Sequence, residues 1–225
     1  MSLKIRFVTD YVCPYCLAAK MPLLEAIKGK DIEVEFLPYE VTQEPSPRVD
    51  TYHDEGRREK WAKTLAPAVK ALGIDMKLPP KVIPRPYTRL AFEGSYYARE
   101  HGLYDAYNDR MYTAYFSDEM DIGNLDVLCE LAGEIGLDAA DFRAALETGT
   151  YTERQKAAVA YAKNELDVHS VPTIFIGDTR VEGGIYTKDG FEKLIQDSLY
   201  KENEAQKDEA HVIKGVSCDI NGCSL

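Results

Sequence analysis

The cysteine pair Cys13 and Cys16 constrains the fold most, because it lies between a short strand pattern and a helical pattern. Alternating apolar residues predict a strand at Lys4–Thr9, and apolar positions at helical spacing predict a helix at Pro14–Lys28. A second strand pattern follows at Ile32–Leu37. The segment therefore reads as a β-α-β unit, whose parallel strands need a right-handed crossover. This places both cysteines at the first strand-to-helix junction of an α/β fold.

The motif Cys13-Pro14-Tyr15-Cys16 places a thiol just before the first helical turn. Unpaired backbone N–H groups and the positive end of the helix dipole favour a thiolate there. We therefore expect Cys13 to be the nucleophile and Cys16, one turn further in and more sheltered, to be the resolving thiol. Half of a zinc site is the alternative for an isolated pair of this spacing, and its position directly after a strand disfavours that alternative.

A long helical segment separates this unit from the next strands, because strand patterns disappear from Pro38 to about Thr150. Candidate helices lie near 56–72, 88–101, 104–116, 124–135 and 138–147. Between the first two, Lys77–Arg89 contains four prolines and should run as an extended connector. Its ordinary interpretation is a stiff loop without chemistry.

The C-terminal part returns to mixed structure. A helix is predicted at Thr152–Leu166, followed by a buried strand within Val171–Gly177 and a strand at Thr179–Glu182 that could form a hairpin with it. A last amphipathic helix is expected from Thr187 through Leu199. This part therefore reads as a β-β-α unit.

Pro172 interrupts a strand pattern and needs an explanation. A cis bond between Val171 and Pro172 would supply one. Because Pro172 has no N–H, the backbone of Val171 would be free to pair with an extended substrate. The alternative is a trans proline that only begins the strand.

Together, the Cys-Pro-Tyr-Cys motif at a helix start, the helical insertion and the run His169-Ser170-Val171-Pro172-Thr173 resemble the DsbA superfamily of thioredoxin-fold oxidoreductases. The resemblance implies an α/β thioredoxin-like fold with a large all-helical insertion at about 38–150, between the N-terminal β-α-β unit and the C-terminal β-β-α unit. One domain would span 1–200, and 201–225 would be a charged tail.

Within this superfamily, the segment Pro86–Gly102 and the cysteines near the carboxyl end are similar to the FrnE-like cytoplasmic branch. The resemblance implies thiol-disulfide exchange with Cys13 as nucleophile, Cys16 as resolver and Pro172 in cis. Tyr15 stands where the periplasmic oxidases carry His, so their strong oxidising power is not expected here.

Four residues beside these groups are candidates for substrate binding: Val171, Pro14, Tyr15 and His169. His169 could approach the active site and stabilise a thiolate. A loop histidine satisfied by backbone groups is an equally good interpretation of its position.

The C-terminal tail carries Cys218 and Cys223, separated by an Asn-Gly step that favours a tight turn. A cross-link closing so short a loop would stabilise the fold by only about 2 kcal/mol, so a structural staple is a poor explanation. We expect a second redox pair that acts as a relay or regulator; an inert pair and metal binding are the alternatives. Cys129, by contrast, lies on an apolar helical stripe and is expected in the core.

Composition narrows the partners. The net charge of −11, from 38 acidic and 27 basic residues, disfavours nucleic acid and anionic membrane surfaces. The sequence begins in a strand pattern without a signal-peptide pattern, and five cysteines are too few for a disulfide scaffold, so a cytoplasmic protein is expected. The expected partners are protein thiols and disulfides or low-molecular-weight thiols, without cofactor or resident metal.

Two other functions remain open. A glutathione-dependent isomerase or transferase would share this fold, but such relatives carry Ser at the nucleophile position. A zinc-binding or redox-sensing module would combine Cys13, Cys16, Cys218 and Cys223 in one tetrathiolate.

Overall fold

The computed structural model describes residues 3–182, 187–213, 217–219 and 222–224. Strand β1 (Leu3–Thr9) leads through helix α1 (Pro14–Ile27) to strand β2 (Ile32–Pro38). β1 and β2 pair in parallel, with Phe7 opposite Phe36. The predicted β-α-β unit is confirmed.

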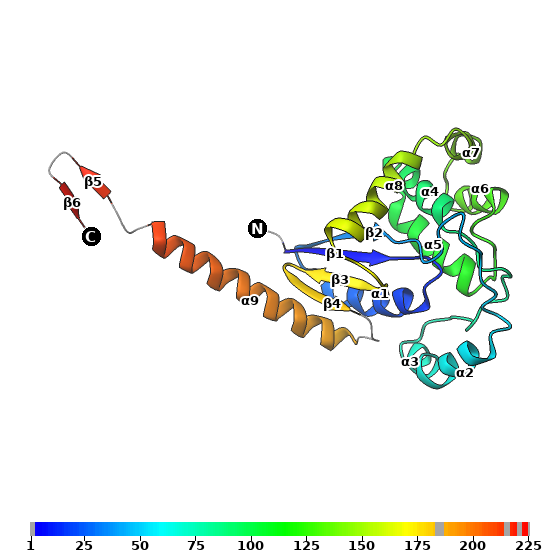
Figure 1. Ribbon diagram of the computed structural model, residues 1–225, viewed down its shortest axis with the longest axis horizontal. Helices are drawn as coiled ribbons and strands as arrows, with labels where there is room; N and C mark the ends of the chain where they lie inside the picture. The colour runs from blue at the N-terminus through cyan, green and yellow to red at the C-terminus, as the bar shows by residue number, and fades with distance from the viewer. Residues whose placement is uncertain (1–2, 183–186, 214–216, 220–221, 225) are drawn as a thin grey trace.

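The second half of the sheet comes from the C-terminal part of the chain. β3 (Thr173–Ile176) and β4 (Thr179–Glu182) form an antiparallel hairpin, and β3 also pairs antiparallel with β1. The strand order is β2-β1-β3-β4. This confirms the predicted α/β architecture, in which a helical insertion separates the two halves of one sheet (Figure 1).

The inserted helices lie between β2 and β3, as predicted. They are α2 (Glu55–Thr64), α3 (Ala66–Ala71), α4 (Arg89–Glu100), α5 (Tyr104–Phe116), α6 (Leu125–Glu134), α7 (Ala139–Glu147), α8 (Thr152–Ala160) and the π-helical turn η1 (Tyr161–Glu165). The helix expected at 56–72 is two helices that meet at Leu65. Pro67 explains this break, because it has no N–H to continue the hydrogen-bond ladder of α2.

Each face of the sheet has its own apolar cover. Ile5 and Ile174 point to the side of α1 and of helix α9 (Lys188–Ile213), where Phe191 belongs to the same buried cluster. Val8 and Phe175 point to the other side, where they pack with Ala162, Val168 and Leu37. Both faces of the sheet are therefore covered at its centre, and all four residues of β3 are buried.

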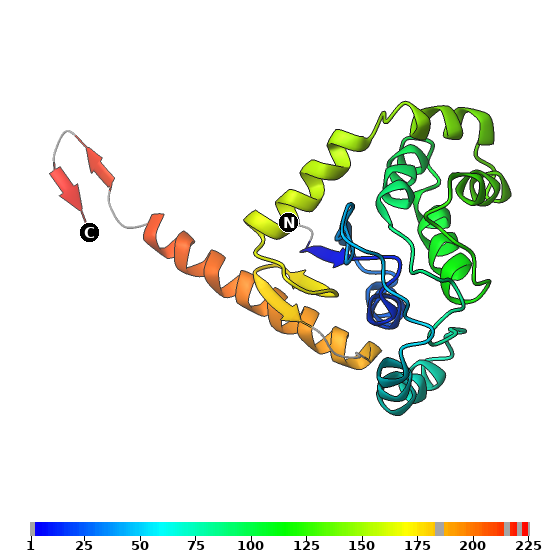
Figure 2. The same ribbon diagram turned by 45° about the vertical axis from the view of Figure 1, so that its right-hand side comes forward.

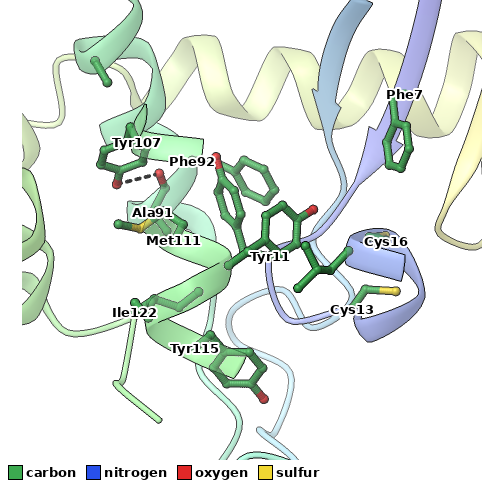
Figure 3. Packing of buried hydrophobic residues seen from close by; sticks show 14 of the residues in the cluster. Phe7, Tyr11, Cys13, Cys16, Ala91, Phe92, Tyr107, Met111, Tyr115 and Ile122 are labelled. Atoms are coloured by element: carbon green, nitrogen blue, oxygen red, sulfur yellow. Dashed lines mark hydrogen bonds between the residues drawn. The ribbon is translucent and has the colours of Figure 1, made fainter. Parts of the chain in front are cut away.

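Tyr11, in the turn between β1 and α1, joins the sheet to the helical insertion. Its ring stacks on Phe92 of α4 at 4.5 Å and meets Tyr112 of α5 edge to face at 5.2 Å between centroids. Figure 3 shows Tyr11 between the cysteines of α1 and the insertion helices. This packing fixes the turn that leads into Cys13.

Helix α9 runs along the sheet and then continues beyond it (Figures 1 and 2). The first part of the predicted charged tail continues this helix as far as Ile213. At its end, β5 (Ser217–Asp219) pairs antiparallel with β6 (Gly222–Ser224), and Cys218 lies opposite Cys223. No helix in the described part of the chain is long and apolar enough to cross a membrane.

Candidate active site around Cys13 and Cys16

Cys13 is the N-cap residue of α1. Its backbone is extended, its N–H donates to the Asp10 carbonyl at 3.0 Å, and Pro14 opens the helix. The Cys13 carbonyl then accepts the Cys16 N–H at 3.1 Å. The thiol therefore lies at the positive end of the α1 dipole, where a thiolate is stabilised.

Cys16 lies one turn further in and is fully buried, whereas the side chain of Cys13 keeps 8% of its surface exposed. Burial raises the pKa of Cys16 well above its ordinary value, and the neighbouring Cys13 raises it further. Both thiols are free in this structure. The pair therefore combines one reachable and one sheltered sulfur.

The Val171–Pro172 bond is cis, which confirms the predicted isomer. The Cys13 thiol contacts the Val171 carbonyl oxygen at 3.5 Å, so the loop before β3 lies directly against the N-terminus of α1. The Val171 N–H makes no hydrogen bond to any other residue that the structure describes. One backbone donor beside Cys13 is therefore free.

A buried carboxylate lies beneath this turn. Asp10 is fully buried and accepts hydrogen bonds from the Val41 N–H at 2.7 Å and the Val12 N–H at 3.4 Å. Burial raises the pKa of Asp10 to about 6, although these hydrogen bonds and the charge of Arg85 act in the opposite direction. Asp10 thus ties the β1–α1 turn to the segment after β2.

A cavity of about 630 Å³ opens beside Cys13. The first turn of α1 and the loop from His169 to Val171 form one side of it. Helix α2 forms another, with Arg57, Lys60 and Trp61, and Arg85 comes from the proline-rich connector. Segments far apart in the sequence therefore meet around one thiol.

The predicted substrate-binding residues Val171, Pro14, Tyr15 and His169 all line this cavity. The imidazole of His169 is 78% exposed and lies 2.9 Å from the Asp167 carboxylate, so a side chain rather than the backbone partners it. The His169 carbonyl accepts from the Tyr39 hydroxyl at 3.2 Å. The structure thus places His169 at the cavity rim.

The remaining cysteines lie elsewhere. Cys129 is buried in α6 within the main apolar cluster, which confirms its predicted core position. The backbones of Cys218 and Cys223 lie beyond the end of α9, and the structure does not bring them to Cys13 (Figures 1 and 2). For Cys218 and Cys223 the structure describes the backbone but not the side chains, so the tetrathiolate alternative is not tested. Within the described residues, no group of three or more His, Cys, Asp or Glu side chains is placed to hold a metal ion.

Sequence reasoning did not assign Asp10, Arg57, Lys60 or Arg85 to the site. Helical spacing could have grouped Arg57, Lys60 and Trp61 on one face of α2, but spacing does not tell what that face meets. The connector containing Arg85 was expected to be a loop without chemistry, and its place in the cavity wall follows from contacts distant in sequence.

Comparison with known proteins agrees with this architecture. The DSBA-like thioredoxin domain family matches residues 4–196. The uncharacterized protein YwbO of Bacillus subtilis (strain 168) is 43% identical over 201 residues, which cover 89% of this chain and 100% of YwbO.

Two solved structures show the same fold. A probable DsbA oxidoreductase from Streptomyces coelicolor has a TM-score of 0.72 at 19% identity, covering 100% of this chain and 99% of its own. The cytosolic disulfide reductase DsbM from Pseudomonas aeruginosa, in a structure with GSH, has a TM-score of 0.64 at 18% identity, covering 88% of this chain and 100% of its own. With its matching sequence and fold, the chain belongs to the DSBA-like thioredoxin domain family.

Proposed function

We propose that this protein is a thiol-disulfide oxidoreductase in which Cys13 is the nucleophile and Cys16 the resolving thiol. Membership of the DSBA-like family supports an oxidoreductase or isomerase that acts on thiols and disulfides. The observation that carries the residue assignment is the asymmetry of the pair: Cys13 lines the cavity at a helix N-terminus, whereas Cys16 is fully buried and does not line it.

In the first step, the Cys13 thiolate attacks one sulfur of a substrate disulfide. A bond forms between Cys13 and that sulfur, the substrate S–S bond breaks, and the other substrate sulfur leaves as a thiolate. The helix N-terminus stabilises the attacking thiolate, and the Val171 carbonyl at 3.5 Å accepts from the protonated thiol.

In the second step, Cys16 loses its proton and attacks the Cys13 sulfur. The mixed disulfide breaks, the second substrate sulfur leaves, and a Cys13–Cys16 disulfide remains, so two electrons pass to the substrate. The thiolate is the nucleophile, so Cys16 must first give up the proton that burial holds on it, and the substrate thiolate released in the first step accepts that proton. The reverse sequence oxidises a substrate dithiol.

Substrate backbone can dock beside Cys13. The Val171 N–H has no hydrogen-bond partner among the described residues and would donate to an extended substrate in the manner of a strand edge. Pro14, Tyr15 and His169 would contact the substrate from the other cavity walls. Pro172 contributes by positioning Val171.

Catalysed reduction of insulin by dithiothreitol tests this function. Wild type should accelerate the reaction, and Cys13→Ser should abolish the acceleration. Cys129→Ala serves as a matched control, because that buried thiol lies in α6 away from the cavity and should leave the rate unchanged. Equal rates with and without wild-type protein would refute the proposal.

The glutathione-dependent alternative predicts a different outcome. An isomerase or transferase of this fold would conjugate or rearrange an electrophilic substrate with glutathione without needing Cys16. The presence of two thiols at the helix start supports dithiol exchange instead. A conjugation assay with the Cys16→Ser variant separates the two, because exchange turnover requires Cys16 and conjugation does not.

For the C-terminal segment 201–225, we propose a tail whose Cys218 and Cys223 exchange with the first pair. The two residues are opposite each other in the β5–β6 ladder, which supports their acting as a pair.

We also propose that the protein belongs to the FrnE-like branch and is located in the cytoplasm. Fractionation of cells that express the protein tests the location. A cytosolic setting is also that of the structurally similar DsbM.

A further inference from the structure

We propose that the cavity beside Cys13 is an anion-binding subsite that selects small thiols and disulfides carrying carboxylate groups, with Arg85 as its main anchor and Lys60 as a second contact. This inference rests on the proposed exchange function and names the substrate class that the same site prefers. It is carried by the cavity, by a face of α2 and by a buried guanidinium.

The cavity has the size and position for such a ligand. Its volume of about 630 Å³ lies within the range of roughly 300 to 1,000 Å³ that small-molecule sites occupy. Cys13 is part of its wall, so a ligand held there has its sulfur atoms within reach of the nucleophile. A ligand of the size of a short peptide would fill the cavity between α1 and α2.

The α2 wall of the cavity carries two cationic side chains, although the whole chain has a net charge of −11. Arg57 and Lys60 project from one face of α2, with the Trp61 ring beside them and the Arg57 guanidinium 5.6 Å from that ring. Lys60 is exposed and has no ion-pair partner among the described residues. Its ammonium group is free to meet a carboxylate.

Arg85 is the strongest sign of a missing partner. Arg85 is only 8% exposed, yet it forms no salt bridge with any carboxylate of the described residues. Nη2 donates to Thr42 Oγ1 at 2.7 Å, whereas Nε is buried and has no hydrogen-bond partner. Buried guanidinium groups are normally paired, because the cost of removing the charge from water is otherwise not offset. A ligand carboxylate in the cavity would supply that pair.

The other charged groups that the structure describes around the cavity do not form an ion pair with Arg85 or Lys60. Asp54 is the one carboxylate among the described lining residues, and it already caps α2 by accepting from the N–H and Nε of Arg57. Asp10 attracts Arg85 from beneath the cavity but makes no ion pair with it. His169 at the rim is engaged by Asp167.

The experiment compares three small disulfides that differ in charge. They are dithiodipropionate, which is anionic, hydroxyethyl disulfide, which is neutral, and cystamine, which is cationic. Each is mixed with reduced full-length protein, the reaction is quenched with acid, and oxidation of Cys13 and Cys16 is followed by alkylation and mass spectrometry. Each second-order rate constant is divided by the one for dithiothreitol with the same disulfide, which removes intrinsic differences in reactivity.

Wild type should prefer the anionic disulfide, and added salt should weaken the preference. Arg85→Gln should lower the rate with dithiodipropionate by about tenfold or more relative to the rate with hydroxyethyl disulfide in the same variant, because a hydrogen bond to a charged group is lost. Lys60→Gln should reduce the same preference by roughly twofold to fivefold, as expected for an exposed pair. Lys63→Gln is the matched control on α2: Lys63 pairs with Glu59, is not a lining residue, and should change nothing.

Equal normalised rates for the three disulfides in wild type would overturn the subsite, as would an Arg85→Gln variant that slows all three equally. Should Arg85→Gln fail to fold, Lys60→Gln and the salt dependence of wild type still decide the question. Failure of the exchange function itself is distinguishable, because wild type would then react with none of the three disulfides.

Discussion

Ionisation of the buried Asp10 should make the protein less stable as the pH rises towards neutrality. The pKa of Asp10 is raised to about 6, mainly by burial, whereas a free aspartate titrates near about 3.9. The folded state therefore binds the proton more tightly than the unfolded state. Its contribution to stability is complete below the unfolded pKa and is lost as the pH rises through the folded pKa.

The size of this effect follows from the two pKa values. A difference of about two pKa units corresponds to about 3 kcal/mol in total. Nearly half, roughly 1.4 kcal/mol, is lost between about pH 5 and about pH 7.5. For a chain of this size, that loss corresponds to a change in Tm of about 3 to 6 °C.

The Asp10→Asn variant isolates the contribution, because asparagine keeps the shape of the side chain and does not ionise. The cost of replacing the acceptor of the Val41 N–H is the same at both pH values and cancels in the comparison. Thermal unfolding of the reduced proteins should show that the Tm of wild type minus that of the variant falls by about 3 to 6 °C from about pH 5 to about pH 7.5. A constant difference in Tm across this range would refute the reasoning.

Three further experiments have clear expected outcomes. Gly94→Ala should destabilise the fold by about 2 kcal/mol or more, measured by urea unfolding, because its Cβ would lie 2.6 Å from the Phe142 ring; wild-type stability would contradict this. Limited alkylation of the reduced protein should modify Cys13 before Cys16, since Cys16 is fully buried and burial raises its pKa; peptide mapping that finds the opposite order would reverse the assigned roles. Truncation after Lys214 should alter insulin turnover and the oxidation rate of Cys13, and unchanged kinetics would leave the tail cysteines without a role.

Sequence patterns predicted the secondary structure that depends only on neighbouring residues. The alternation in β1 and the helical spacing after Pro14 placed Cys13 at a strand-to-helix junction, and the structure has it at the N-cap. The effect of proline is also local, because a residue without an N–H cannot donate a backbone hydrogen bond in any helix or strand. The sequence predicted a single helix at 56–72, whereas the structure has a break at Leu65. Pro67 causes this break because it lacks the N–H that would continue the helix.

The cavity could not be predicted, because its walls come together through tertiary packing. The face of α2 that carries Arg57 and Lys60 reaches the cavity because Trp61 of α2 belongs to the same buried cluster as Ala18 of α1. Arg85 lies in a segment whose sequence shows only extended backbone. Burial of charged side chains such as Asp10 depends on contacts between distant segments, and hydrophobic periodicity does not predict such contacts.

Trapping of the first exchange intermediate tests the central claim most directly. The Cys16→Ser variant, reduced and then mixed with hydroxyethyl disulfide, lacks the thiol that would resolve a mixed disulfide. Cys218 and Cys223 are also replaced by Ser in this variant, so that the proposed exchange with the tail cannot resolve the mixed disulfide. Mass spectrometry of the quenched protein should then find one adduct, on Cys13, with the buried Cys129 unmodified. Absence of an adduct on Cys13, or an adduct pattern that is unchanged when Cys13 is also replaced by Ser, would contradict the account.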